Sequence, residues 1–333
     1  MKIFVYGAGA FAIALGTVLN NNGHELTFYC RDENRCKKLN ETHLENKYFN
    51  YLKLDSKIRF TNCLSEISNF SIIIIATPSK SIHEVVKFLN EKLLGKSVLL
   101  ISATKGLEPT TNSTILEFYK KNLDSRIKYQ LASILGPGFA KKIIQKDLTC
   151  VNAVSNNIEV AKFVQKIFSN EYFRVYALDD EVGAEFSSSI KNAIAIGSGI
   201  LYGLGYKENA RSALITRGLT ELVRFGTFFG AKKETFFGLT GVGDLILTCS
   251  SNESRNFAFG EMIGKSNNAQ FVIENNSKTV EGLNATKVVY FLAKQNNIDM
   301  PIINSLYEIL FMNKKPSEIL KEIMTRPLRT ETI

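Results

Sequence analysis

The chain has 333 residues, with 41 Lys and Arg against 32 Asp and Glu, for a formal net charge of +9. Hydrophobic residues make up 45% of the sequence and charged residues 22%, which argues against a disordered, collagen-like or coiled-coil chain. The length suits two domains with separate cores. The lysines are dispersed without a long basic run, so the charge favours a solvated surface or an anionic small substrate over a nucleic-acid groove.

Five cysteines without a CxxC pair and three histidines without ligand spacing predict neither a disulfide framework nor a metal site. The apolar run Ile3–Leu19 resembles a signal peptide in its hydrophobicity. Three glycines, at 7, 9 and 16, interrupt it, however, and a strand–helix pattern continues directly after it. We therefore expect a cytoplasmic protein. No later stretch is long and apolar enough to predict a membrane span.

In chain order, residues 1–180 alternate short apolar runs with longer amphipathic ones, which predicts a parallel, Rossmann-like doubly wound sheet covered by helices on both faces. The expected strands are Ile3–Tyr6, Leu26–Tyr29, Ile72–Ala76, Val98–Ser102, Leu131–Leu135 and Cys150–Val154, and the expected helices include Ala10–Asn22, Lys80–Leu94 and Ile158–Phe168.

After residue 180 the strand patterns stop and apolar residues recur at helical spacing, starting with Val182 to Ile194. We expect an α/β chain with a dinucleotide-binding domain at 1–180 and an all-helical substrate and catalytic domain at 181–333. Its further helices are expected at Glu208–Phe225, Glu253–Gly264, Gly282–Gln295, Ile302–Phe311 and Ser317–Met324.

The run Gly7-Ala8-Gly9-Ala10-Phe11-Ala12 follows the first strand and opens the first helix, which is the context of a dinucleotide fingerprint. Gly7 permits the tight turn, Gly9 lets a pyrophosphate approach the backbone, and Ala12 is small enough for helix–strand contact. The helix N-terminus offers N–H groups to the phosphates. A plain glycine turn is the alternative.

The end of the second strand bears on the choice between NAD and NADP, because an acidic residue there suits a ribose hydroxyl and an arginine suits a 2′-phosphate. Arg31 lies nearest to that position, which favours NADP, with NAD left open. Asp32 has two interpretations, a ribose contact or a helix N-cap.

Two further turns follow strands, where doubly wound sheets place ligands. Lys105 lies in the turn after Val98–Ser102, and residues 136–140, Gly-Pro-Gly-Phe-Ala, open a helix after Leu131–Leu135. Each could bind an anion or be an ordinary turn.

The helical half holds a third cluster. Lys191 and Asn192 interrupt an apolar helix, where the lysine either reaches solvent or is buried and exchanges protons. Asp244 ends a glycine-rich run and either caps a helix or orients that lysine. Ser250 and Glu253 have the spacing of a capping box, which places Arg255 and Asn256 in a first helical turn that suits a substrate phosphate. A surface arginine is the alternative.

Together these runs resemble the NAD(P)-dependent sn-glycerol-3-phosphate dehydrogenase family over nearly the whole chain. The resemblance rests on the fingerprint and on the runs 103–107, 136–140, 191–197, 209–218, 243–249, 254–256, 280–282 and 300–302.

The resemblance implies a reversible reduction of dihydroxyacetone phosphate to sn-glycerol 3-phosphate, supplying glycerophospholipid synthesis. It implies that Lys191 exchanges the proton, with Lys105 and Asp244 as the other catalytic residues. The implied cofactor contacts are Gly7, Gly9, Ala10, Phe11, Ala12, Arg31, Lys105, Ala140, Arg255, Val280 and Glu281. The implied substrate contacts are Lys105, Gly136, Gly138, Lys191, Asn192, Asp244, Thr248, Ser254, Arg255 and Asn256.

The sequence departs from the family at Ala10, where serine is frequent, and at Gly138, where serine or threonine is usual. Ala10 lacks a hydroxyl for the cofactor phosphate, and at Gly138 one substrate hydrogen bond is either missing or replaced by a backbone one. A single neutral hydrogen bond is worth about 0.5–1.5 kcal/mol, too little to remove the activity. A 2-hydroxyacid or ketopantoate-type reductase, and a nicotinamide sensor or nucleic-acid binder without catalysis, are the competing interpretations. The apolar helices make a homodimer plausible.

Overall fold

The computed structural model describes residues 1–328 and 330–331, so the last two residues of the predicted second domain and residue 329 lie outside the described residues. The chain divides into two compact units. The first comprises Met1–Glu108 and Ser113–Glu181, and the second comprises Pro109–Asn112 and Val182–Ile333.

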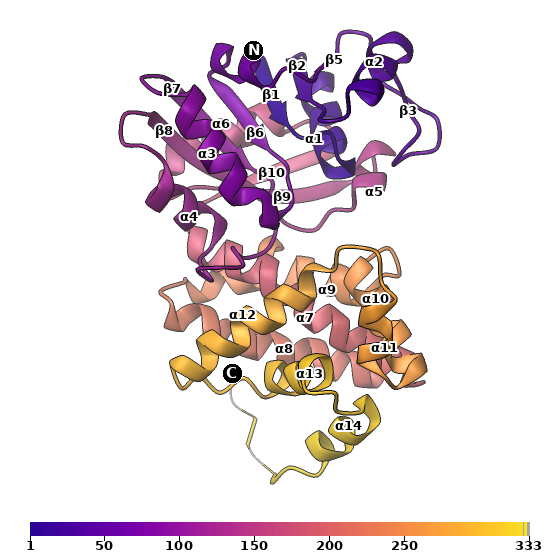
Figure 1. The fold of residues 1–333 in the computed structure, drawn as a ribbon. Helices are drawn as coiled ribbons and strands as arrows, with labels where there is room; N and C mark the ends of the chain where they lie inside the picture. Colours follow the sequence, from indigo (N-terminus) through magenta and orange to yellow (C-terminus); the bar gives the residue numbers. More distant parts are fainter. Residues whose placement is uncertain (329, 332–333) are drawn as a thin grey trace. The chain divides into compact units, whose positions relative to one another are not determined.

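Among the described residues, the first unit contains an eight-stranded sheet with the order β10-β9-β8-β7-β6-β1-β2-β5 (Figure 1). Strands β5, β2, β1, β6, β7 and β8 are parallel and have the 3-2-1-4-5-6 order of dinucleotide-binding folds. The Rossmann-like sheet is thus confirmed. The strands are β1 Lys2–Tyr6, β2 Glu25–Tyr29, β5 Arg59–Thr61, β6 Ile72–Ile75, β7 Ser97–Ser102, β8 Lys128–Leu135, β9 Thr149–Val154 and β10 Phe173–Leu178, and a separate pair is formed by β3 Leu44–Glu45 and β4 Leu52–Lys53.

The expectation of a parallel sheet throughout is wrong at one edge, where β9 runs antiparallel to β8. The connection between them contains only the five-residue helix α5, Ala140–Ile144. Such a helix spans about 7.5 Å, whereas the eight residues of β8 extend over roughly 27 Å. The helix is too short to return the chain to the start of β8, so β9 begins where β8 ends.

Helices cover both faces of the sheet because successive strand residues point to opposite sides. In β1, Ile3 and Val5 belong to a core cluster with residues of α1, α2 and α6, whereas Phe4 and Tyr6 belong to a cluster with residues of α3 and α4. The remaining elements of this unit are α1 Ala10–Asn21, α2 Glu33–Thr42, α3 Ile82–Lys92, α4 Ile115–Asn122, α6 Ile158–Phe168, η1 Leu64–Asn69 and η2 Ser79–Ser81.

The second unit is helical throughout its described elements. None of the helices in the described part of the chain combines the length and apolar character needed to cross a lipid bilayer. The elements are α7 Glu181–Gly203, α8 Glu208–Phe228, η3 Lys233–Phe237, η4 Leu239–Gly243, α9 Asp244–Ser250, α10 Arg255–Ser266, α11 Ala269–Glu274, α12 Glu281–Gln295, α13 Pro301–Phe311 and α14 Pro316–Met324.

Helices α7 and α10 approach each other so closely that glycine is required at the contact. A Cβ on Gly199 would lie 2.0 Å from the carbonyl oxygen of Phe257, and a Cβ on Gly260 would lie 2.0 Å from that of Ile196. Gly203 and Gly264 extend the same contact one turn further. Because α7 carries Lys191 and α10 begins at Arg255, this contact fixes the spacing between two helices that hold predicted site residues.

Candidate active site

The fingerprint glycines lie between β1 and α1. Gly7 has a φ of +121°, and a Cβ there would lie 2.9 Å from the carbonyl oxygen of Ala76. Gly9 is the N-cap of α1, no side chain caps this helix, and a Cβ on Gly9 would meet open space. Ala12 is buried in the core below. The first-turn N–H groups of α1 therefore suit an anion, as the pyrophosphate interpretation of the fingerprint requires.

At the end of β2, the structure supports the helix-cap interpretation of Asp32. Its Oδ1 accepts a hydrogen bond of 3.0 Å from the backbone N–H of Arg35, in the first turn of α2, which begins at Glu33. The Arg35 side chain pairs with the buried Glu45 and donates a 2.9 Å hydrogen bond to the carbonyl of Ala8. Arg31 is exposed to solvent, so its guanidinium is the accessible one at this position.

Two more predicted turns have the expected local structure. Lys105 follows β7, and its ammonium lies 5.0 Å from the ring centroid of Phe11, in the first turn of α1. Gly136 has a φ of +137°, and a Cβ there would lie 3.1 Å from the Cα of Val151. Gly138 precedes α5, which begins at Ala140. All of these residues belong to the first unit.

In the second unit, Lys191 of α7 and Asp244, the first residue of α9, form an ion pair. Their side chains are 3% and 2% exposed, so the interpretation of Lys191 as a lysine that reaches solvent is wrong. The hydroxyl of Thr248 donates to the Asp244 carbonyl at 2.6 Å and lies 3.3 Å from Oδ1 of the same residue. Burial removes the hydration of both ions. The pair compensates that cost only through close contact between the two charges and further hydrogen bonds, such as those of Thr248.

The segment before Asp244 is distorted. The π-helical turn η4 has non-helical backbone angles at Gly241, where a Cβ would lie 2.0 Å from the carbonyl oxygen of Phe236. Such π-helical turns occur often at functional sites. The distortion ends at Gly243, so the carboxylate of Asp244 enters from the start of a new helix.

Next to Lys191, Asn192 belongs to a buried chain of amide hydrogen bonds. Asn256 donates to the side-chain oxygen of Asn192 at 2.9 Å, and its own oxygen accepts from the N–H of Gly282 at 2.9 Å. Asn192 in turn donates to the backbone of Ser188 and, at 3.5 Å, to Glu281. The starts of α10 and α12 are thereby bound to the middle of α7.

The capping box predicted at Ser250 and Glu253 is wrong, since Ser250 is the last residue of α9. The N-cap of α10 is Ser254, whose hydroxyl accepts from the N–H of Phe257 at 3.3 Å. Arg255, the first residue of α10, is exposed, whereas the next residue, Asn256, is buried. The guanidinium and the helix start thus remain together, as the phosphate interpretation expects.

Two features of this site were missed in the sequence. Gly282 has to be glycine, because a Cβ would lie 2.5 Å from the carbonyl oxygen of Asn192. Cys249 is buried near Lys191 and Asp244, and its burial raises the pKa of the thiol, which keeps it protonated.

The close contact of α7 with α10 was also missed. The available signal was the spacing of four between glycines, at 199 and 203 and again at 260 and 264.

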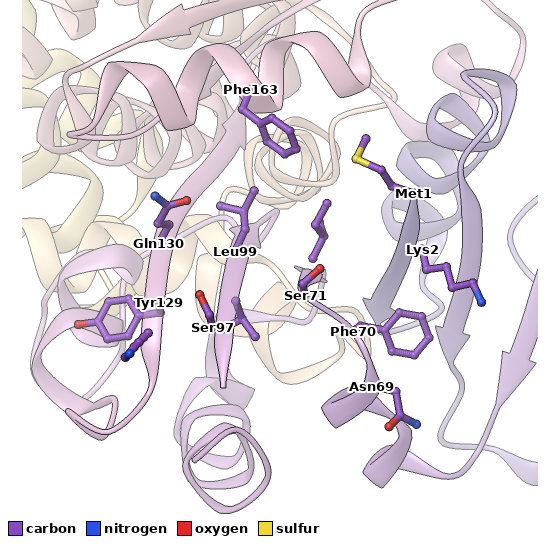
Figure 2. A pocket seen from close by; sticks show the side chains of 13 residues that line it. Met1, Lys2, Asn69, Phe70, Ser71, Ser97, Leu99, Tyr129, Gln130 and Phe163 are labelled. Atoms are coloured by element: carbon purple, nitrogen blue, oxygen red, sulfur yellow. The ribbon is translucent and has the colours of Figure 1, made fainter. Parts of the chain in front are cut away.

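A prominent hollow lies elsewhere. A hollow of about 820 Å³ lies at the amino ends of β1, β6, β7 and β8. Figure 2 shows the side chains that line it. The residues that line it include Lys2, Phe70, Ser97, Tyr129 and Phe163, and none of the predicted site residues lines it. The fingerprint and Lys105 lie at the carboxyl ends of these strands, where doubly wound sheets bind ligands.

Comparison with known proteins decides the family. The family model described as NAD-dependent glycerol-3-phosphate dehydrogenase N-terminus matches residues 2–161, and the corresponding C-terminus model matches residues 180–321. The chain belongs to the NAD-dependent glycerol-3-phosphate dehydrogenase family. A glycerol-3-phosphate dehydrogenase [NAD(P)+] of Staphylococcus aureus is 39% identical over 331 residues, covering 99% of both chains.

Solved structures agree with this family. The crystal structure of glycerol-3-phosphate dehydrogenase from Coxiella burnetii matches with a TM-score of 0.90 and 32% identity, covering 98% of this chain and 99% of that one. A ketopantoate reductase of Ralstonia eutropha matches with a TM-score of 0.63 and 15% identity over 96% of this chain and 100% of that chain. The second likeness shows the fold alone. The resemblance to the glycerol-3-phosphate dehydrogenase family is therefore confirmed.

Proposed function

We propose that the chain catalyses the reversible reduction of dihydroxyacetone phosphate to sn-glycerol 3-phosphate with NAD(P)H, with proton exchange through Lys191. The observation that carries the proton step is the buried ion pair of Lys191 and Asp244. Family membership supports the reaction, and the pair supplies a proton donor that is shielded from water.

The first unit fits a dinucleotide. The uncapped start of α1, the open space at Gly9 and the strained turn at Gly7 leave room for a pyrophosphate against the backbone. When bound, the nicotinamide supplies the hydride for C2 of the substrate. This region is bordered by small or aromatic residues of the core cluster, namely Ala10, Phe11, Ala12 and Ala140. The exposed Arg31 supports a preference for the 2′-phosphate of NADP.

The roles of the chain's own residues follow from their surroundings. The Lys191 ammonium donates a proton to the substrate oxygen as negative charge develops there, and Asp244 holds that ammonium in place. Thr248 fixes Asp244, and Asn256 fixes Asn192. Arg255 and the N-terminus of α10, with Ser254, bind the substrate phosphate.

The remaining roles follow the family resemblance. Lys105 contacts both cofactor and substrate, Gly136 and Gly138 contact the substrate through their backbone, and Val280 and Glu281 contact the cofactor. The protein acts in the cytoplasm as a homodimer and supplies sn-glycerol 3-phosphate for glycerophospholipid synthesis. It does not bind nucleic acid.

The test is loss of NADPH or NADH absorbance with purified protein and dihydroxyacetone phosphate, with unphosphorylated dihydroxyacetone as the control. We expect rapid oxidation that requires the phosphate and is faster with NADPH. Lys191→Met is expected to lower kcat by about 100-fold or more while NADPH binding persists. Cofactor binding without oxidation would reject the reaction, and near-normal turnover of Lys191→Met would reject the proton role.

A further inference from the structure

The loop that carries Lys105 contacts residues 77–83, which follow β6, at three successive positions. The Thr104 hydroxyl donates to the carbonyl of Thr77 at 3.0 Å. Gly106, with a φ of +103°, packs against Ser79, whose Oγ would lie 3.4 Å from a Cβ at this position. Next, Glu108 contacts His83, with 2.7 Å between Oε1 and Nε2. The two residues that flank Lys105, Thr104 and Gly106, are therefore both held by contacts with residues 77–79.

The contact of His83 with Glu108 joins an exposed side chain to a buried one. The Glu108 side chain is fully buried, whereas the His83 side chain is 53% exposed. When Glu108 is ionised its carboxylate only accepts hydrogen bonds, and the matching tautomer of His83 carries its proton on Nε2. The imidazole also meets the ring of Phe118 edge to face, with 4.7 Å between the ring centroids. Packing against α4 thus limits the orientations of the imidazole that contacts Glu108.

The position of this loop sets the backbone point from which the Lys105 side chain reaches the ring of Phe11. Four rotatable bonds separate the ammonium from the backbone, and it lies over the Phe11 ring at 5.0 Å. Phe11 belongs to the first turn of α1, where we propose that the dinucleotide binds. A loop shift of about 1 Å at a reacting group can cost on the order of 100-fold in rate.

We propose that His83 is a positioning residue for the reaction, which holds Lys105 in place through its hydrogen bond to Glu108. The inference rests on the proposed function, in which Lys105 contacts cofactor and substrate. His83 touches neither and acts only through the loop. The sequence alone does not indicate this role. His83 lies outside the dinucleotide fingerprint, and the three histidines show no metal-ligand spacing.

The first experiment compares two substitutions at this position. His83→Leu removes the hydrogen bond, whereas His83→Gln keeps an N–H donor at about the distance of Nε2. We expect His83→Leu to lower kcat/KM for dihydroxyacetone phosphate by about 10-fold and His83→Gln to restore most of that loss. Lys87→Leu is the matched control, because Lys87 is exposed one turn further along α3. Its kcat/KM should equal that of the unmodified protein.

The second experiment is a double-mutant cycle with Lys105→Met, read as kcat/KM. Lys105→Met alone is expected to lower kcat/KM by about 100-fold. If His83 acts through Lys105, His83→Leu has little further effect in the Lys105→Met background, whereas a role in general stability lowers kcat/KM by the same factor in both backgrounds.

The outcomes separate the inference from the function on which it rests. No phosphate-dependent oxidation by the unmodified protein would reject the proposed function. An unchanged kcat/KM in Lys105→Met would reject the role of Lys105, and with it this inference. A loss in Lys105→Met without one in His83→Leu, or equal losses from His83→Leu in both backgrounds, would reject only the positioning role of His83.

Discussion

Replacing Asp244 by asparagine should destabilise the protein strongly, because it removes the carboxylate that pairs with the buried Lys191 ammonium. Both side chains are nearly inaccessible, at 3% and 2% exposure. Removing one member of such a pair costs about 3–5 kcal/mol, since the remaining charge keeps its desolvation cost and loses its compensation. Asp244→Asn should therefore lower the free energy of unfolding by that amount, measured by urea titration with circular dichroism.

The sharper result comes from the double variant Lys191→Met/Asp244→Asn. With both charges of this pair gone, neither member leaves a buried charge without its counter-ion, so this variant should be more stable than Asp244→Asn alone by about 0.5–3 kcal/mol. Neither variant should turn over dihydroxyacetone phosphate at a normal rate. A free energy of unfolding within about 0.5 kcal/mol of the unmodified protein for Asp244→Asn, or losses that simply add in the double variant, would refute the reasoning.

Three further predictions concern the second unit. Burial raises the pKa of Glu221 to about 7 from its ordinary 4.5, against opposing hydrogen bonds from the N–H groups of Ile302 and Ile303. Its contribution to stability is therefore present below pH 4.5 and is lost as the pH rises to about 7. Between urea titrations at pH 5 and pH 8 that loss is about 2.5 kcal/mol, and it should be absent in Glu221→Gln; equal pH slopes in the two proteins would contradict this. Gly260→Ala, whose Cβ would lie 2.0 Å from the Ile196 carbonyl, should force α7 and α10 apart, costing about 1–3 kcal/mol and lowering kcat/KM; normal values of both would disprove the close-contact argument. Arg255→Ala, at an exposed position, should raise the KM for dihydroxyacetone phosphate without changing stability, and an unchanged KM would remove Arg255 from the phosphate site.

The central strands could be predicted from sequence because they are buried on both faces and form continuous apolar runs. The predicted Ile72–Ala76 differs from β6 by one residue, and β1, β2, β7 and β9 begin one residue before their predicted starts. The two strands at the ends of the sheet, β5 and β10, were missed. In β10, buried and exposed residues alternate at the start, since an edge strand has less of its surface covered.

Local capping signals were not sufficient at the start of α10. Ser250 and Ser254 are both possible N-caps, and the first has the better partner in Glu253, three residues later. The structure selects Ser254, where Asn256 can reach Asn192 and Gly260 can meet α7. The deciding interactions join residues more than 60 positions apart, so no window of local sequence contains them.

The residue types of the candidate site were visible in sequence, but their arrangement depends on tertiary packing. Lys191 and Asp244 are 53 residues apart, and only the packing of α7 against the start of α9 brings them together. The alternatives for Lys191, solvent or burial, could not be separated by sequence because both occur in amphipathic helices. The pairing of His83 with Glu108 is invisible for the same reason, since each residue reads as a surface charge.

The glycine contact and the amide chain depend on each other. Only because Gly199 and Gly260 let the backbones of α7 and α10 touch can the short side chains of Asn192 and Asn256 meet at 2.9 Å. That hydrogen bond in turn compensates two buried amides, which would otherwise cost about 1–3 kcal/mol each. Because the side-chain nitrogen of Asn256 donates to Asn192 and its side-chain oxygen accepts from the N–H of Gly282, the orientation of both amides is fixed. The residue next to Lys191 is therefore held by hydrogen bonds to an amide and to the backbone, with one longer contact to Glu281. In the proposed mechanism the Lys191–Asp244 pair and Arg255 are then left to act on the substrate and its proton.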